Sequence, residues 1–240
     1  MKTLFVSDLH LDAAHPEIGQ QFDAFLGAEA RAAEALYILG DLFEAWLGDD
    51  DPDPAARATV RSLRALSDSG VSLFVMHGNR DFLIGERFCR ETGARLLADG
   101  TVVDLYGERV LLAHGDALCT DDVSYQRLRR IVRNPVVRGL FRIMTLEQRR
   151  ALARRLRAGS REHVGATAPE IMDVNAAAVI QAFRDAGVRT LIHGHTHRPA
   201  VHDLEIEGAP AQRIVLGDWY AQGSVLELTP GGLELRVLPR

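Results

Sequence analysis

Five short apolar segments of this sequence end in side chains that can bind a metal ion. They are TLFVSDLH (3–10), ALYILGD (35–41), SLFVMHGN (72–79), VLLAHGD (110–116) and TLIHGHTH (190–197). Continuous apolar runs of this length are typical of strands buried on both faces of a sheet. In open α/β sheets, binding sites form beyond the carboxyl ends of the strands. We therefore expect the polar side chains at these five ends to lie close together.

Helical and extended patterns alternate along the first half of the chain. Residues 17–33 and 55–69 carry apolar positions at helical spacing, and Gly70 is placed to end the second helix. A hairpin is expected near 100–115, and further strands occupy the C-terminal fifth. The pattern predicts one α/β domain over residues 1–240, with two sheets that are each partly covered by helices.

The segment 122–170, here called the insertion, is helical and lacks strand patterns. Pro135 is expected to end one helix and to sit in the first turn of the next. Thr145 to Gln148 fits a capping box and Gly159 fits a helix end, so a further helix is expected over 146–158. These signals predict a helical insertion, or lid, on the α/β core.

The side chains at the strand ends offer oxygen and nitrogen ligands and no sulfur, which suits Mn²⁺, Fe, Zn²⁺ or Mg²⁺. A single aspartate or histidine at a strand end is more often just solvated, and Gly-Asp or Gly-Asn is often a plain turn. The ordered set of five favours a metal site. In extended chain, residues two apart point the same way, so each Asp-x-His or His-x-His pair can face one site. The candidate ligands are Asp8, His10, Asp41, Asn79, His114, His195 and His197.

Charge is unevenly distributed between the insertion and the rest of the chain. Residues 121–163 hold twelve arginines and four acidic residues, a net charge of +8, so the remainder carries −13 of the total of −5. A basic segment on an acidic body indicates an anionic partner. The insertion can offer an apolar face to acyl chains and arginines to phosphates or an anionic membrane surface. The other interpretation, a helical pair packed on its own core with solvated arginines, stays open on composition alone.

Several classes of protein are excluded by composition. No apolar stretch approaches the roughly 18 residues that a membrane span needs, and the start MKTLFVSDLHLD lacks the apolar region of a secretory signal. Cys89 and Cys119 are 30 positions apart and give no reason to expect an oxidising compartment. We expect a cytoplasmic protein.

The ordered set DLH…GDLFE…GNRD…H…GHTH resembles the calcineurin-like metallophosphoesterase superfamily. The resemblance implies an αββα sandwich of two mixed sheets around a two-metal centre. It also implies that one ion is held by Asp8, His10, Asp41 and His197, and the other by Asp41, Asn79, His114 and His195. Glu44 and Arg80 depart from the general pattern. Arginine is a poor proton donor but a good phosphate clamp, so we expect Arg80 to bind phosphate.

A narrower set of segments resembles the UDP-2,3-diacylglucosamine hydrolases of lipid A biosynthesis: LGDLFEAWLGDD, HGNRDFL, HGDALCTDD, MDVN and IHGHTHRPAVH. This resemblance implies two Mn²⁺ ions, catalytic roles for Asp41, Arg80 and His195, and a peripheral place on the cytoplasmic face of the inner membrane. Attack of a metal-activated hydroxide on the α phosphorus of UDP-2,3-diacylglucosamine would give UMP and 2,3-diacylglucosamine 1-phosphate (lipid X). The implied substrate contacts are Asn79, Arg80, Asp122, Ser160 and His195. Members of the family often have polar or basic residues at the positions of Val164 and Thr167. Val164 departs from that pattern, so the resemblance does not carry a headgroup contact over to it.

Two other functions stay open at this point. One is another dinuclear metallophosphoesterase, such as a nuclease or a phosphoprotein phosphatase. The acidic body argues against a broad nucleic-acid footprint, so no nucleic-acid partner is expected. The other is a non-catalytic scaffold, which would not need a complete ligand set. We expect a monomer.

Overall fold

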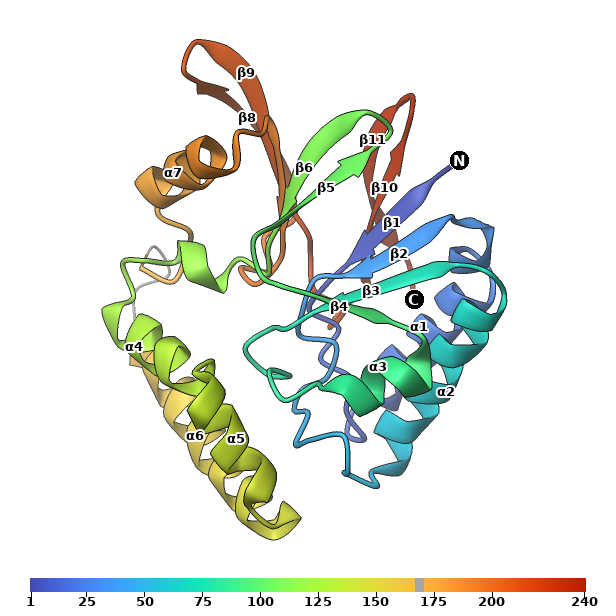
Figure 1. Cartoon of the computed structure of the whole chain (residues 1–240), viewed down its shortest axis with the longest axis vertical. Helices are drawn as coiled ribbons and strands as arrows, with labels where there is room; N and C mark the ends of the chain where they lie inside the picture. Colours follow the sequence, from blue (N-terminus) through green and yellow to red (C-terminus); the bar gives the residue numbers. More distant parts are fainter. Residues whose placement is uncertain (167–170) are drawn as a thin grey trace.

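The computed structural model describes residues 1–166 and 171–240, and it describes side chains outside 159–170. In this part of the chain the strands form two mixed sheets, one of six strands and one of five, which face each other across a shared core (Figure 1). Helices lie on the outer faces of both sheets. The predicted αββα sandwich is confirmed.

The first sheet has the strand order β11-β10-β1-β2-β3-β4. Neighbours β1 to β4 are parallel, whereas β10 runs antiparallel to β1 and to β11. The carboxyl ends of β1, β2 and β3 therefore meet at one edge of the sheet. Its strands are β1 (Thr3–Val6), β2 (Ala35–Ile38), β3 (Ser72–Met76), β4 (Arg95–Leu97), β10 (Gly223–Thr229) and β11 (Gly232–Leu238).

The second sheet has the order β5-β6-β7-β9-β8, in which β6, β7 and β9 are parallel neighbours. The expected hairpin near residues 100–115 is the pair β5–β6. The strands are β5 (Thr101–Leu105), β6 (Glu108–Leu112), β7 (Thr190–His193), β8 (Ala200–Ile206) and β9 (Ala209–Val215).

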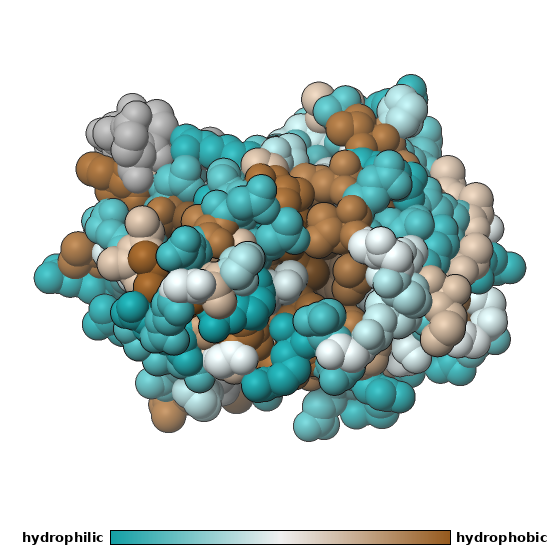
Figure 2. Space-filling view, turned by 90° about the horizontal axis from the view of Figure 1, so that it is seen from above, coloured by the Kyte–Doolittle hydropathy of each residue, from teal (hydrophilic) through white to brown (hydrophobic). Residues whose placement is uncertain are grey.

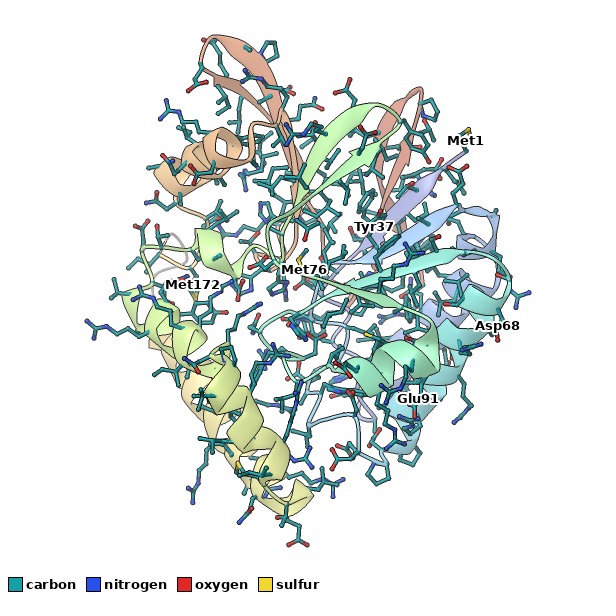
Figure 3. All side chains as sticks on the ribbon, viewed as in Figure 1. Met1, Tyr37, Asp68, Met76, Glu91 and Met172 are labelled. Carbon is teal, nitrogen blue, oxygen red and sulfur yellow. The ribbon has the colours of Figure 1, made fainter. Side chains whose placement is uncertain are left out.

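The core between the sheets is built from the inward faces of both. Tyr37 and Met76 of the first sheet pack there with Leu112 and Ile192 of the second, and Figure 3 shows where Tyr37 and Met76 lie. At the end of the sandwich formed by the hairpins, hydrophobic residues lie between hydrophilic flanks (Figure 2). Strands β1 and β2 are buried along their whole length because their sheet is covered by the other sheet inside and by helices outside.

Helices α1 (Pro16–Gly27), α2 (Pro54–Asp68) and α3 (Glu86–Thr92) cover the first sheet, and α7 (Ala176–Ala186) covers the second. The start of α2 is set by Asp53, whose carboxylate accepts the Ala56 N–H at 2.9 Å. Its end is set by Gly70, whose φ of +99° favours glycine. Short 3₁₀ turns lie at Ala30–Ala32 (η1) and Asp116–Leu118 (η2).

The insertion contains α4 (Val123–Val132), α5 (Pro135–Ile143) and α6 (Leu146–Ala166), which lie on one side of the sandwich (Figure 1). Pro135 begins α5 as predicted. The capping box is also confirmed, because Thr145 Oγ1 accepts the Gln148 N–H and Gln148 Oε1 accepts the Thr145 N–H. No helix among the described residues is long and apolar enough to cross a bilayer.

Three local predictions were wrong. The helix expected over 17–33 stops at Gly27 and is followed by η1. The strand β4 was missed, because its three residues Arg95–Leu97 are too few and too exposed to give a periodic signal. Helix α6 continues past Gly159, the residue at which it was expected to end. A glycine inside a helix costs only about 1 kcal/mol, so it marks a possible end and does not impose one.

Candidate dinuclear metal centre and adjoining cavity

The seven candidate ligands come from the loops that follow five strands of both sheets. Asp8 and His10 follow β1, and Asp41 follows β2. Asn79, His114 and the pair His195 and His197 follow β3, β6 and β7 in the same way. Because the two sheets face each other, the carboxyl ends of these strands meet at one end of the sandwich, and the seven side chains gather there.

The backbone at these ligands is unusual. Seven of the described non-glycine residues have positive φ, and five of these seven are candidate ligands. The five have φ between 52° and 70°: Asp8, His10, Asp41, His195 and His197. Non-glycine residues adopt this left-handed region rarely, and such strain concentrates at functional sites. The extended Asp-x-His and His-x-His segments expected from spacing are therefore wrong: left-handed turns, not pleating, aim these side chains.

One group of ligand atoms consists of Asp8, His10 and His197. The Nε2 atoms of His10 and His197 lie 3.3 Å apart, and His197 Nε2 lies 3.4 Å from Asp8 Oδ1. Asp8 and His10 are almost fully buried. His195 belongs to the second group, which is the division of His195 and His197 that the resemblance implied.

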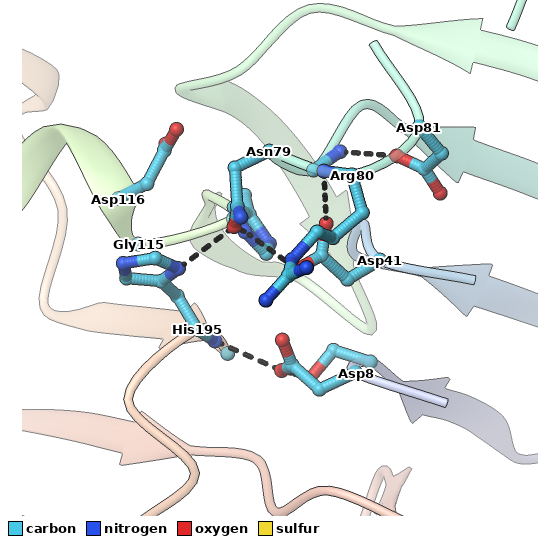
Figure 4. Close-up of polar contacts among 12 residues, drawn as sticks. Asp8, Asp41, Asn79, Arg80, Asp81, Gly115, Asp116 and His195 are labelled. Atoms are coloured by element: carbon cyan, nitrogen blue, oxygen red, sulfur yellow. Dashed lines mark hydrogen bonds and ion pairs between the residues drawn. The ribbon is translucent and has the colours of Figure 1, made fainter. Parts of the chain in front are cut away.

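The second group consists of Asp41, His114 and His195. Asn79 joins it, because its Oδ1 lies 3.1 Å from both His114 Nε2 and His195 Nδ1 (Figure 4). Asp41 lies between the groups, since its Oδ2 is 3.8 Å from His114 Nε2 and 3.8 Å from His10 Nε2. This arrangement agrees with the bridging position that the resemblance implied for Asp41.

In three of the four imidazoles the outer nitrogen has its own partner. His10 Nδ1 lies 3.1 Å from Glu44, His197 Nδ1 lies 3.4 Å from Asp218, and His114 Nδ1 lies 2.9 Å from the Leu39 carbonyl. Partners of this kind fix the ring orientation of metal-binding histidines. Sequence reasoning noticed Glu44 but gave it no role, and it missed Asp218, which follows β9 with only a Gly-Asp pair as its signal.

The charges of the first group fit a cation. Burial alone would raise the pKa of Asp8, but the hydrogen bond and charge of His197 hold it below its usual range. Burial would lower the pKa of His197, yet Asp218 and Asp8 raise it to about 10. Apart from His197 Nε2 at 3.4 Å, the buried Oδ1 of Asp8 has no hydrogen-bond partner among the described residues. The carboxylates of Asp8 and Asp218 therefore favour a positive charge here, whether it is a proton on His197 or a metal ion.

The second group also fits a metal ion. Burial, followed by the charge of His114, lowers the pKa of His195 to about 4, so its ring is neutral at physiological pH. Neutral imidazole is the form that binds metal ions. The residues of both groups therefore fit a pair of divalent cations.

Two glycines allow the ligand loops to pack this closely. A Cβ at Gly78 would lie 2.0 Å from Asp41 Oδ1, and a Cβ at Gly194 would lie 2.2 Å from Ser7 Oγ. The neighbouring Asp81 is fully buried and accepts the N–H groups of Gly78 and Leu42 at 2.7 and 2.8 Å. Asp81 thereby ties the β2 loop to the β3 loop (Figure 4).

Arg80 lies at the edge of the second group. Its backbone N–H donates to Asp41 Oδ1 at 2.8 Å, and its guanidinium contacts Glu44 at 3.1 Å. Burial would raise the pKa of Glu44, but contacts with His10 and Arg80 lower it. Arg80 is about one quarter exposed and lines a cavity, so it is not simply a surface arginine.

Asp116 joins the insertion to the second group. This fully buried carboxylate contacts Arg129 Nε at 2.9 Å and Arg133 NH2 at 3.0 Å, and it accepts the Tyr125 hydroxyl at 2.9 Å. The Tyr125 ring stacks on His195 with centroids 5.7 Å apart. Sequence reasoning missed this network because its acidic and basic members lie on different elements.

A cavity of about 360 Å³ lies between the ligand loops and the insertion. Asn79, Arg80 and Tyr125 border it on the side of the second group. Its remaining wall is largely apolar and comes from the 44–47 loop, the β3 loop and all three insertion helices. The apolar lining residues are Ala45, Trp46, Leu47, Phe82, Leu83, Leu128, Val132, Phe141, Ala153 and Leu156.

Comparisons with known proteins agree with this site. Residues 1–199 match the family described as Calcineurin-like phosphoesterase. The chain is 56% identical over 232 residues to the UDP-2,3-diacylglucosamine hydrolase of Pseudomonas aeruginosa (strain UCBPP-PA14), with 97% of each chain covered. It is 54% identical over 239 residues to the enzyme of that name from Salmonella arizonae, with 100% of each covered. The chain belongs to the UDP-2,3-diacylglucosamine hydrolase family of calcineurin-like phosphoesterases.

Solved structures show the same fold for this phosphoesterase. A dimetal phosphatase from Danio rerio has a TM-score of 0.53 at 12% identity, covering 99% of this chain and 95% of that one. A novel archaeal phosphodiesterase has a TM-score of 0.50 at 13% identity, covering 99% and 100%.

One expected substrate contact of this phosphoesterase, Asp122, is not among the described residues that line the cavity. Asp122 is buried and caps α4, where its carboxylate accepts the Tyr125 N–H at 2.9 Å. Its predicted contact with substrate stays a prediction. The side chains of Ser160, Val164 and Thr167 lie outside the described residues.

The charge asymmetry is partly neutralised within the molecule. Arg149 and Arg150 pair with Asp50 and Asp51, and Arg157 lies 3.9 Å from Glu44. With Arg129 and Arg133, five of the insertion arginines whose side chains are described thus pair with carboxylates of the core. The net charge of the segment therefore overstates what it can offer to an external anion.

Proposed function

We propose that this chain hydrolyses UDP-2,3-diacylglucosamine at its diphosphate, giving UMP and 2,3-diacylglucosamine 1-phosphate for lipid A biosynthesis. The observation that carries the proposal is the apolar cavity that opens directly beside Asn79 and Arg80. A diphosphate at the ligand groups and acyl chains in this cavity can be bound at the same time. A nuclease or phosphoprotein phosphatase has no use for such a wall, and the relatives at 56% and 54% identity carry the hydrolase name.

The chemistry divides between the ions and the protein. Two divalent cations, when bound, supply an activated water and neutralise phosphate charge. Asp41, from its place between the two groups, would hold both ions at a constant separation. Asn79 and His195 would complete the second ion's ligands, and the remaining candidate ligands keep the roles given above as proposals.

Arg80 would bind the diphosphate and stabilise the charge that develops on it. Its guanidinium is held by Glu44 and lines the cavity mouth. An arginine is a poor proton donor, so it would act through its charge and paired N–H groups. Attack on the phosphorus nearer uridine releases the lipid 1-phosphate. A phosphate is a good enough leaving group to depart without protonation by a strong protein acid.

We propose Mn²⁺ as the physiological ion. Four imidazoles combined with carboxylate and amide oxygens make a set intermediate between the all-oxygen sites of Mg²⁺ and the sulfur-rich sites of softer metals. Metal content of protein purified without added metal, compared with activity after reconstitution with Mn²⁺, Mg²⁺ and Zn²⁺, tests this choice.

We also propose that the insertion binds the cytoplasmic face of the inner membrane, with the protein acting as a peripheral monomer. Large apolar side chains of α4 and α5 are exposed, among them Ile131, Val136, Leu140 and Ile143. Exposed apolar groups on helices that also carry arginines are suited to an anionic bilayer surface. A lipid substrate would then reach the cavity from the membrane.

The decisive experiment follows oxygen from solvent. Purified protein is loaded with Mn²⁺ and incubated with UDP-2,3-diacylglucosamine in H₂¹⁸O, and both products are analysed by mass spectrometry. We expect one ¹⁸O in the phosphate of UMP and none in the lipid 1-phosphate. Label in the lipid product would refute attack at the uridine side, and absence of turnover would refute the proposed substrate.

A further inference from the structure

Tyr220 is an exposed aromatic ring at the edge of the candidate metal centre. It lies in the loop between β9 and β10 and is 46% exposed, whereas the adjacent Trp219 is fully buried. Across the described residues, every other Phe, Tyr and Trp is buried or partly buried. An apolar ring left in solvent beside a polar site is unusual enough to require an explanation.

The ring of Tyr220 is held in a defined position. It stacks on His10 with centroids 5.2 Å apart and planes 7° from parallel, and it lies 6.0 Å from the His197 ring. Its backbone N–H donates to Asp218 at 3.0 Å, and the Trp219 N–H donates to the Asp8 carbonyl at 3.3 Å. The loop is therefore fastened to the first ligand group, and His10 covers one face of the ring.

The place of Tyr220 relative to the cavity defines a direction across the site. The cavity is lined on the side of the second group by Asn79, Arg80 and Tyr125. None of the first-group ligands Asp8, His10 and His197 is among its described lining residues. A substrate with its acyl chains in the cavity and its diphosphate over both groups must place its other end beyond the first group. Tyr220 stands at that end.

We propose that Tyr220 forms a nucleobase subsite, in which the base of the nucleotide half stacks on the ring face that His10 leaves open. This inference rests on the proposed function, because it takes the cavity to hold the lipid half. Bases stack on aromatic rings whatever their hydrogen-bonding edges, because each presents a π face. The subsite therefore favours a ligand that carries a planar base over one that lacks a base. It discriminates weakly between uracil and cytosine.

The competing role for Tyr220 is a hydrogen bond from its hydroxyl to a phosphate. The matched variants Tyr220→Phe and Tyr220→Leu separate the two roles. Phenylalanine keeps the ring and loses the hydroxyl, whereas leucine keeps apolar bulk against His10 and loses the π face. Metal content is measured for both variants to show that the first group is intact.

The test is the binding of UMP and of ribose 5-phosphate to Mn²⁺-loaded protein by isothermal titration calorimetry. We expect the wild type to bind UMP about 5- to 150-fold more tightly than ribose 5-phosphate, the range that base–aromatic stacking provides. Tyr220→Phe should keep this ratio and Tyr220→Leu should bring it close to one, with CMP behaving as UMP does. A ratio that is unchanged in Tyr220→Leu, or lost equally in Tyr220→Phe, would overturn the inference.

Failure of this inference is distinguishable from failure of the proposed function. A wild-type ratio near one removes the nucleobase subsite, even if UDP-2,3-diacylglucosamine is hydrolysed. Conversely, the proposed function falls when the purified enzyme does not turn over that substrate, a result that the binding ratio does not influence.

Discussion

The ligand loops and the insertion differ in how the protein holds them. The loops are buried between two sheets, and Asp8, His10, Asp41 and His114 have almost no exposed surface. The insertion packs less completely, because in α4 and α5 only Phe141 is buried. Its attachment to the core depends on ion pairs, such as those of Asp116 with Arg129 and Arg133.

This difference indicates a division of work. Strained, left-handed backbone at five of the seven ligands aims side chains whose positions must be accurate to fractions of an ångström. The insertion forms the wall for a flexible lipid, which needs apolar surface and tolerates local movement. We therefore expect substitutions in the loops to affect chemistry and substitutions in the insertion to affect lipid recognition.

The largest expected effect comes from Asp41→Asn, because this carboxylate lies between both ligand groups. Turnover of UDP-2,3-diacylglucosamine should fall by a factor on the order of 10³ or more, since metal-ion catalysis supplies several kcal/mol. Metal content by mass spectrometry should fall in parallel. The control is Asp12→Asn, at a nearby carboxylate that caps its own turn. Wild-type turnover by Asp41→Asn with full metal content would contradict the proposed site.

The second-largest expected effect concerns the ion pairs that attach the insertion to the core. Asp116→Ala removes the buried carboxylate that Arg129, Arg133 and Tyr125 share. Breaking a buried ion pair costs about 3 kcal/mol or more, so the free energy of unfolding in urea should fall by about that amount. Asp185→Ala, at an exposed helix position, should change it by less than about 0.5 kcal/mol. Equal effects of the two variants would show that the attachment is not held by charge.

Glu44→Gln sharpens the comparison within the loops. Glu44 orients His10 and also holds Arg80, so the first group should lose metal affinity by about 10- to 100-fold. Titration of metal-free protein with Mn²⁺ should then show one tight site and one weakened site. Two sites as tight as in the wild type would mean that Glu44 does not orient a metal ligand.

The smallest expected effect concerns the exposed surface of the insertion. Ile143→Asp should reduce co-sedimentation with anionic vesicles about tenfold, because burial of one large apolar side chain contributes about 1.5–3 kcal/mol. The control is Val237→Asp, which also replaces an exposed apolar side chain by aspartate but lies on β11, outside the insertion. It should leave vesicle binding unaltered. Arg149 and Arg150 are unsuitable for this test, since both pair with core carboxylates. Equal losses in the two variants would argue against a membrane-facing insertion.

The sequence alone determined the architecture and the identity of the candidate ligands. Runs such as TLFV and TLIH predicted buried strands, and the polar residues after them predicted where the site would lie. These inferences succeed because hydrophobic periodicity and strand-end position are local properties of the chain. Pro135 and the capping box at Thr145 succeeded for the same reason.

Tertiary structure alone decided how the backbone aims the ligands and what surrounds them. His195 and His197 are two residues apart, yet left-handed backbone places them in different groups. The partners Asp218, Asp116 and Tyr220 come from other elements, and their roles arise only when two sheets and an insertion meet. Contacts between residues far apart in sequence depend on packing, which no local pattern encodes.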